Sequence, residues 1–88
     1  MNKLNLIFNS QDERARNYLN DLKELAQEHN SLISVNDWTI QLTSDTLLNF
    51  ISTGLLDGKL YLRFINRDTG KTLLSIPMDA IFAVTSLL

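Results

Sequence analysis

The stretch that decides the fold is KLYLRFINRDTGKTLLSIPMDAIFAV, residues 59–84. Apolar and polar side chains alternate at its start, which is the period of a strand with one buried face. The sequence RDTG follows as a turn, with glycine where a left-handed backbone is needed. The pattern therefore predicts a β-hairpin in which Leu60, Leu62 and Phe64 face the core.

The return strand of this hairpin, residues 71–76, carries two adjacent leucines, so we expect both of its faces to be partly covered. Pro77 cannot donate a hydrogen bond to a sheet and should end the strand. A tight turn over residues 78–80 is expected next, with a short helix from Pro77 as the alternative. Residues 81–88 are then predicted to form a further strand.

A helix is predicted over residues 11–29, because its apolar positions recur at spacings of three and four. Ser10 and Glu13 have the spacing of a capping box at its start, and Asn30-Ser31 should end it. The apolar stripe fits either the core of one chain or the interface of a homodimer. The residues that would form this interface are Tyr18, Leu19, Leu22, Leu25 and Ala26.

The other segments complete a small sheet. Residues 1–9 are either an extra edge strand or an ordered arm, and residues 32–35 are a short strand candidate. Trp38, Ile40 and Leu42 alternate with polar residues and should face inward. A short helix is expected over residues 44–53, with Thr43 or Ser44 as its cap and Gly54 as its stop.

These elements predict an α+β fold in a single domain over residues 1–88. An N-terminal helix would pack on a small, strongly bent, mostly antiparallel sheet formed by residues 32–88. The chain has 88 residues, a net charge of −2 and no cysteine. This balance does not predict bulk attraction to nucleic acid or to an anionic membrane. Short apolar runs and the lack of a signal-peptide layout favour the cytoplasm.

No catalytic, metal or cofactor site is predicted. His29 is the only histidine, and at a helix C-terminus it fits the helix dipole better than catalysis. The acidic pairs of the helix lie on its solvent side, and the three glycines are too dispersed to cradle a phosphate. We therefore expect the protein not to be an enzyme.

The second face of the hairpin is the candidate binding surface. Lys59, Tyr61, Arg63 and Arg67 line up along its first strand. They fit a solvated face whose charges prevent edge pairing. They also fit a groove for an extended peptide, in which Arg63 meets a carboxylate. Nucleic acid is a further alternative, since Tyr61 can stack on a base, but the overall acidity makes it less favoured.

The segment from Trp38 to Val84 resembles the stringent starvation protein B (SspB) family of peptide-binding adaptors, which deliver tagged proteins to a protease. The resemblance lies in the pair Arg63-Phe64 and in the corner formed by Pro77, Ala80 and Ile81. It implies a bent, Sm-like sheet, a dimer formed largely through the N-terminal helix, and a groove for degradation-tag peptides near Arg63-Phe64.

The sequence also departs from the family in three places. The loop near residues 35–38 is shorter, Ile65-Asn66 replaces the glycines expected after Arg63-Phe64, and the family's long C-terminal tail is absent. We therefore expect peptide binding without the family's way of tethering clients to the protease.

The leading hypothesis is a non-enzymatic, SspB-like interaction domain, a homodimer that binds peptides or a protein partner. One alternative is a small inhibitor, encoded by a phage or mobile element, that blocks a host protein. The other is an Sm-like RNA-binding protein.

Overall fold

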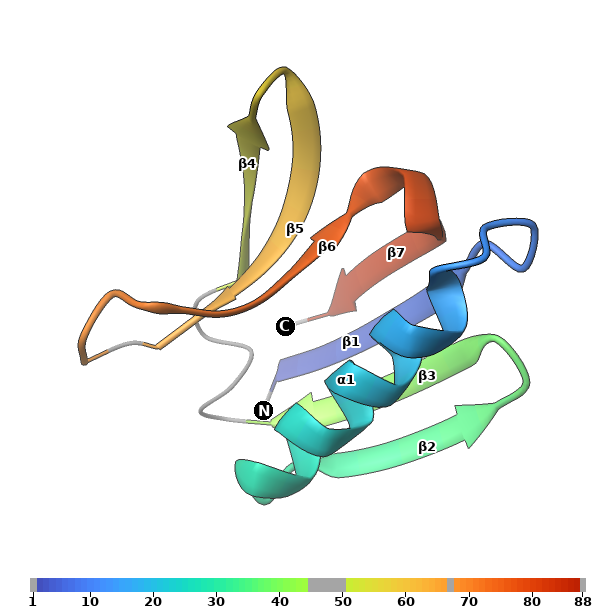
Figure 1. Ribbon diagram of the computed structural model, residues 1–88. Helices are drawn as coiled ribbons and strands as arrows, with labels where there is room; N and C mark the ends of the chain where they lie inside the picture. The colour runs from blue at the N-terminus through green and yellow to red at the C-terminus, as the bar shows by residue number, and fades with distance from the viewer. Residues whose placement is uncertain (1, 45–50, 67, 88) are drawn as a thin grey trace.

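The computed structural model describes residues 2–44, 51–66 and 68–87 and confirms the α+β class, with one α-helix packed on antiparallel strands. Figure 1 shows the arrangement of the elements. In chain order they are β1 (Asn2–Phe8), α1 (Ala15–Glu28), β2 (Leu32–Asn36), β3 (Thr39–Ser44), β4 (Ile51–Leu56), β5 (Lys59–Ile65), β6 (Thr72–Pro77), the 3₁₀ helix η2 (Met78–Ala80) and β7 (Ile81–Leu87).

The strands form two sheets. The first, sheet A, has the order β2-β3-β1-β7, and the second, sheet B, has the order β4-β5-β6. All the strand pairs are antiparallel. Residues 2–8 form a strand, as one of the two predicted alternatives had it, but β1 lies between β3 and β7 and not at the edge of the sheet. Its alternating residues Leu4, Leu6 and Phe8 bury one face, and its pairing with β3 on one side and β7 on the other makes it a central strand.

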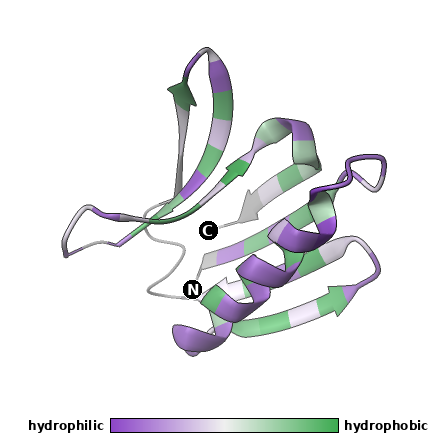
Figure 2. Cartoon of the chain, viewed as in Figure 1, coloured by the Kyte–Doolittle hydropathy of each residue, from purple (hydrophilic) through white to green (hydrophobic). Residues whose placement is uncertain are grey.

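The core fills the space between α1 and the inner faces of both sheets. Sheet A contributes Leu4, Leu6, Phe8, Ile40 and Leu42, sheet B contributes Leu62, Phe64 and Ile76, and the helix contributes Ala15, Leu19, Leu22, Leu25 and Ala26. The helix contacts β1 and β2 of sheet A and β6 of sheet B, and its opposite side is hydrophilic (Figure 2).

This packing corrects the proposed dimer interface. Leu19, Leu22 and Ala26 are at most 1% exposed and Leu25 is 8% exposed within one chain. Tyr18 is half-buried against the same core. A side chain already covered by its own sheets offers no surface to a second copy. The apolar stripe of the helix is therefore core.

The helix begins later than the sequence predicted. It starts at Ala15, with Arg14 at the N-cap and no side chain capping it, so the capping box of Ser10 and Glu13 is not formed. The preceding turn is held by other groups. The Asn9 Oδ1 atom accepts from the Gln11 amide at 3.0 Å, and Asp12 Oδ1 accepts from the Arg14 amide at 2.8 Å.

The end of the helix agrees with the sequence. Asn30 has a φ of 53°, a left-handed conformation that asparagine tolerates well. The Ser31 amide donates to the Ala26 carbonyl at 2.9 Å, and the Asn30 amide donates to the Gln27 carbonyl at 3.2 Å. These two bonds form a Schellman motif, so Asn30-Ser31 ends the helix as predicted.

The short helix predicted at residues 44–53 is wrong at both ends. Ser44 is the last residue of β3, and residues 51–53 belong to β4; residues 45–50 lie outside the described ranges. Gly54 lies inside β4 and does not end a helix. The missed feature is a hairpin between β4 and β5, closed by Asp57 and Gly58, whose φ angles are 51° and 79°. Asp-Gly with two positive φ angles is the pair that a tight type I′ turn requires.

The hairpin of β5 and β6 is formed as predicted. Gly70 adopts a φ of 72° in its turn, and β6 ends at Pro77. The 3₁₀ helix η2 follows as the corner, and the final strand predicted is β7. Leu62 and Phe64 are buried, but Leu60 is 44% exposed because it lies near the hairpin tip, outside the core, paired with the exposed Leu55.

Candidate functional site

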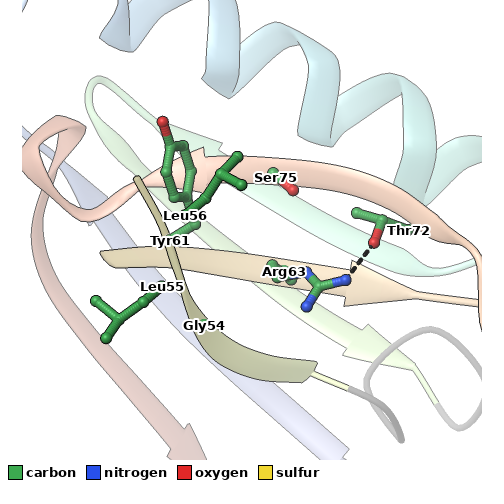
Figure 3. Close-up of a pocket in the computed structure, with 7 residues that line it drawn as sticks. All are labelled: Gly54, Leu55, Leu56, Tyr61, Arg63, Thr72 and Ser75. Carbon is green, nitrogen blue, oxygen red and sulfur yellow. Dashed lines mark hydrogen bonds between the residues drawn. The ribbon is translucent and has the colours of Figure 1, made fainter. Parts of the chain in front are cut away.

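The outer face of sheet B carries an open cavity of about 280 Å³. Its lining residues come from all three strands: Gly54, Leu55 and Leu56 from β4, Tyr61 and Arg63 from β5, and Thr72 and Ser75 from β6. Figure 3 shows Arg63 lying across this face toward Thr72. Strand register explains the grouping, because Gly54 pairs with Tyr61, and Arg63 pairs with Ser75. Directly paired residues point to the same face of a sheet.

The guanidinium of Arg63 is the charged group of the cavity. It is half-buried, and its Nη2 atom donates to the Thr72 Oγ1 atom at 2.6 Å. Within the described residues, no carboxylate forms an ion pair with it. A guanidinium carries five N–H donors, so a neutral hydroxyl leaves most of its capacity unused. This geometry suits an anionic group of a ligand.

Gly54 leaves room above β4 for the Arg63 side chain. A Cβ atom at this position would lie 3.4 Å from both the Cδ and the Nη1 atoms of Arg63. A glycine inside a strand often marks the close approach of another group, and here that group is the arginine side chain. Leu56, 63% exposed, and the half-buried Tyr61 provide apolar surface nearby. The cavity therefore combines a cation with an apolar wall.

The structure brings together two of the four predicted binding residues, Tyr61 and Arg63. Lys59 is exposed beside the hairpin turn, opposite Leu56, and does not line the cavity. Arg67 lies outside the described residues. Sequence reasoning missed five of the lining positions: Gly54, Leu55, Leu56, Thr72 and Ser75. The Asp-Gly pair at residues 57–58 was the signal for the first three, because it predicts a strand on each side of itself.

A second hollow, of about 400 Å³, lies at one end of sheet A. It is lined by the apolar residues Ile7, Phe8, Trp38 and Phe82 and by the polar loop Asn9–Gln11. Trp38 is half-buried in the turn between β2 and β3, and the guanidinium of Arg16 lies 4.2 Å from its ring centroid. None of its described lining residues is charged, so this hollow offers fewer groups for recognising a charged ligand than the Arg63 cavity does.

The structure also shows where His29 lies and bears on the possibility of a metal site. His29 is the C-cap residue of α1, and its amide donates to the carbonyls of Leu25 and Ala26. In the part of the chain that the structure describes, no group of three or more histidine, aspartate or glutamate side chains converges as a metal site would require. None of the described helices is long and apolar enough to cross a bilayer.

Comparisons with protein-family models, with curated proteins and with solved structures found no match to this chain.

Proposed function

We propose that this chain is a non-enzymatic interaction domain that binds an extended peptide, or an extended segment of a protein partner, at the Arg63 cavity. The observation that carries the proposal is the half-buried Arg63 guanidinium, which has only the neutral Thr72 hydroxyl as a partner among the described residues. A partly desolvated cation beside exposed leucine favours a ligand that carries both a carboxylate and an apolar side chain.

The resemblance to the SspB family supplies the more specific form of this proposal. In that form, the ligands are degradation-tag peptides and the domain takes part in regulated proteolysis. A dimer formed through the apolar face of the helix is not part of the proposal, because that face is buried in the core.

The test is a titration of the intact protein into a fluorescein-labelled degradation-tag peptide, followed by anisotropy. We expect saturable binding that Arg63→Ala weakens at least about tenfold, since a hydrogen bond to a charged group contributes about 1.5–3 kcal/mol. Arg63→Lys should recover only part of the affinity, because lysine lacks the planar fork of donors.

Lys3→Ala is the charge-matched control, because Lys3 is an exposed cation on sheet A. An equal loss with Lys3→Ala and Arg63→Ala would show unspecific attraction and overturn the site. A labelled single-stranded RNA forms a second arm. Salt-sensitive RNA binding that requires Tyr61 and Arg63, with no peptide binding, would replace the proposal with the RNA-binding alternative.

A further inference from the structure

Strand β4 is the edge strand of sheet B in the part of the chain that the structure describes. Within the described residues it pairs only with β5. Its sequence, ISTGLL, has none of the charged residues or prolines by which proteins usually prevent edge pairing. Leu55 is 75% exposed and Leu56 is 63% exposed. Such an edge is a template for an added strand.

The hairpin turn determines which backbone groups of β4 point to this edge. Leu56 and Lys59 flank the two-residue turn, and the pair that closes such a turn exchanges both of its backbone hydrogen bonds. Hydrogen-bonded and non-hydrogen-bonded pairs then alternate along an antiparallel ladder. Leu55 and Thr53 therefore hold the positions whose N–H and C=O groups point away from β5, toward the open edge.

The same register determines which side chains of an added strand would meet the cavity. Gly54 and Leu56 point to the outer face, the one that carries Tyr61 and Arg63. Residues of an added strand beside Gly54 and Leu56 would point to this face too, with one residue between them. The Arg63 side chain approaches position 54, where a Cβ atom would be 3.4 Å from its Nη1 atom.

We propose that the ligand adds to β4 as an antiparallel strand, with an apolar side chain beside Leu56 and a carboxylate above Gly54 that accepts from Arg63. This inference rests on the proposed function and names its ligand as an apolar-x-acidic segment. The order follows from direction, because an antiparallel strand passes Leu56 before it passes Gly54. Both sheets of this protein are already entirely antiparallel.

The first experiment compares three labelled, threonine-rich peptides of equal composition by anisotropy with the full chain. One carries leucine-threonine-glutamate, the second the reverse order, and the third leucine and glutamate as neighbours. We expect the first to bind about tenfold more tightly than the others, and Arg63→Ala to remove the difference. Equal affinities, or a preference for the reverse order, would overturn the proposed register while leaving Arg63-dependent binding intact.

The second experiment tests the backbone pairing. Methylation of the peptide amides, one at a time, should weaken binding at alternate positions only, where an N–H faces the carbonyl of Leu55 or Thr53. Tolerance of methylation at every position would exclude strand addition, even if Arg63→Ala still abolished binding. Loss of all peptide binding by the unmodified protein would instead refute the proposed function itself.

A protein variant completes the test. Leu55→Pro removes an amide donor that β5 does not use, whereas Leu55→Thr keeps this donor and removes the same apolar side chain. We expect only the proline variant to lose its affinity for the leucine-threonine-glutamate peptide. Both variants should retain the circular dichroism spectrum of the parent. Equal binding by both would contradict pairing at this edge. The methylated peptides give the same answer if Leu55→Pro does not fold.

Discussion

Gly54 should be a residue whose replacement separates binding from stability. Its φ is outside the left-handed range, so Gly54→Val introduces no backbone strain, and β-branched residues favour strands. The valine side chain would occupy the space that Arg63 and its ligand need. We predict at least about tenfold weaker peptide binding, with a free energy of unfolding unchanged or raised by up to about 1 kcal/mol in urea denaturation.

The same substitution at Gly58 is the matched control, since it has the opposite expected effect on stability. Gly58 needs a φ of 79° for the hairpin turn, and a β-branched residue is strained there. Gly58→Val should lower the free energy of unfolding by roughly 1–3 kcal/mol. Destabilisation by Gly54→Val of the same size would mean that the Arg63 side chain cannot move aside for the valine.

Asp12 should make the free energy of unfolding depend weakly on pH in the acid range. The hydrogen bonds that Arg14 donates, first from its side chain and then from its amide, lower the pKa of Asp12 from 3.8 to about 2. A lowered pKa means that the folded state favours the carboxylate. Its stabilisation is therefore complete above about pH 4 and is lost as the pH falls through about 2.

Asp12→Asn tests this linkage through urea denaturation across that pH range. The variant should be slightly less stable than the parent at pH 7 and equal to it near pH 2. The effect should be small, because the pair lies at the surface and is screened. Glu13→Gln, a neighbouring exposed carboxylate, serves as the control. A difference between Asp12→Asn and the parent that stays constant with pH would contradict the ion pair of Asp12 and Arg14.

At the scale of the element, the start of α1 allows the predicted capping residue, Ser10, to be tested against Asn9, which holds the preceding turn in the structure. Ser10 makes no capping bond, whereas Asn9 accepts from the Gln11 amide and donates to the Asp79 carbonyl at 3.3 Å. We predict that Ser10→Ala changes the free energy of unfolding by less than about 0.5 kcal/mol, and that Asn9→Ala lowers it by about 1 kcal/mol. If Ser10→Ala lowered the free energy of unfolding more than Asn9→Ala in thermal or urea unfolding, the result would support the capping box of Ser10 and Glu13 instead.

The elements that the sequence predicted well are those with a clear period. Alternation located β5, and the three-four spacing located α1, because burial of one face imposes each period. The helix predicted over residues 44–53 was wrong. Ser44, the apolar residues after it and Gly54 have the pattern of a helix with an N-cap and a C-terminal glycine. Pairing with β5 overrode this local preference, as tertiary contacts often do. This error hid three of the seven lining residues of the cavity, since Gly54, Leu55 and Leu56 belong to the strand that was missed.

The remaining cavity residues were hidden for a different reason. Leu73 and Leu74 are adjacent in β6 and both are half-buried, as the sequence indicated. The register of β6 on β5 shifts between Phe64 and Ile65. A pattern with apolar residues on both faces and a register irregularity does not reveal which polar residue faces which way. Thr72 and Ser75 could therefore be placed only by the fold.

For the whole molecule, the buried helix stripe predicts how stability depends on protein concentration. Leu22 is 0% exposed within one chain. Leu22→Ala should therefore lower the free energy of unfolding by about 2–5 kcal/mol, through lost burial and the cavity left behind. This loss should be the same at every protein concentration. A midpoint that rises with concentration in the parent but not in Leu22→Ala would show that the stripe is a dimer interface after all.

The central place of β1 has a consequence for how the protein is made. Lys3 pairs with Thr43 on one side and with Leu87 on the other, so β1 leaves the ribosome before both of its partner strands and receives the second of them much later than the first. The chain grows by about 5–20 residues per second, and contacts between distant residues form slowly. Until β7 emerges, the apolar face of β1 lacks a complete sheet. The nascent chain should therefore depend on chaperones during synthesis and acquire resistance to proteases only after β7 has emerged.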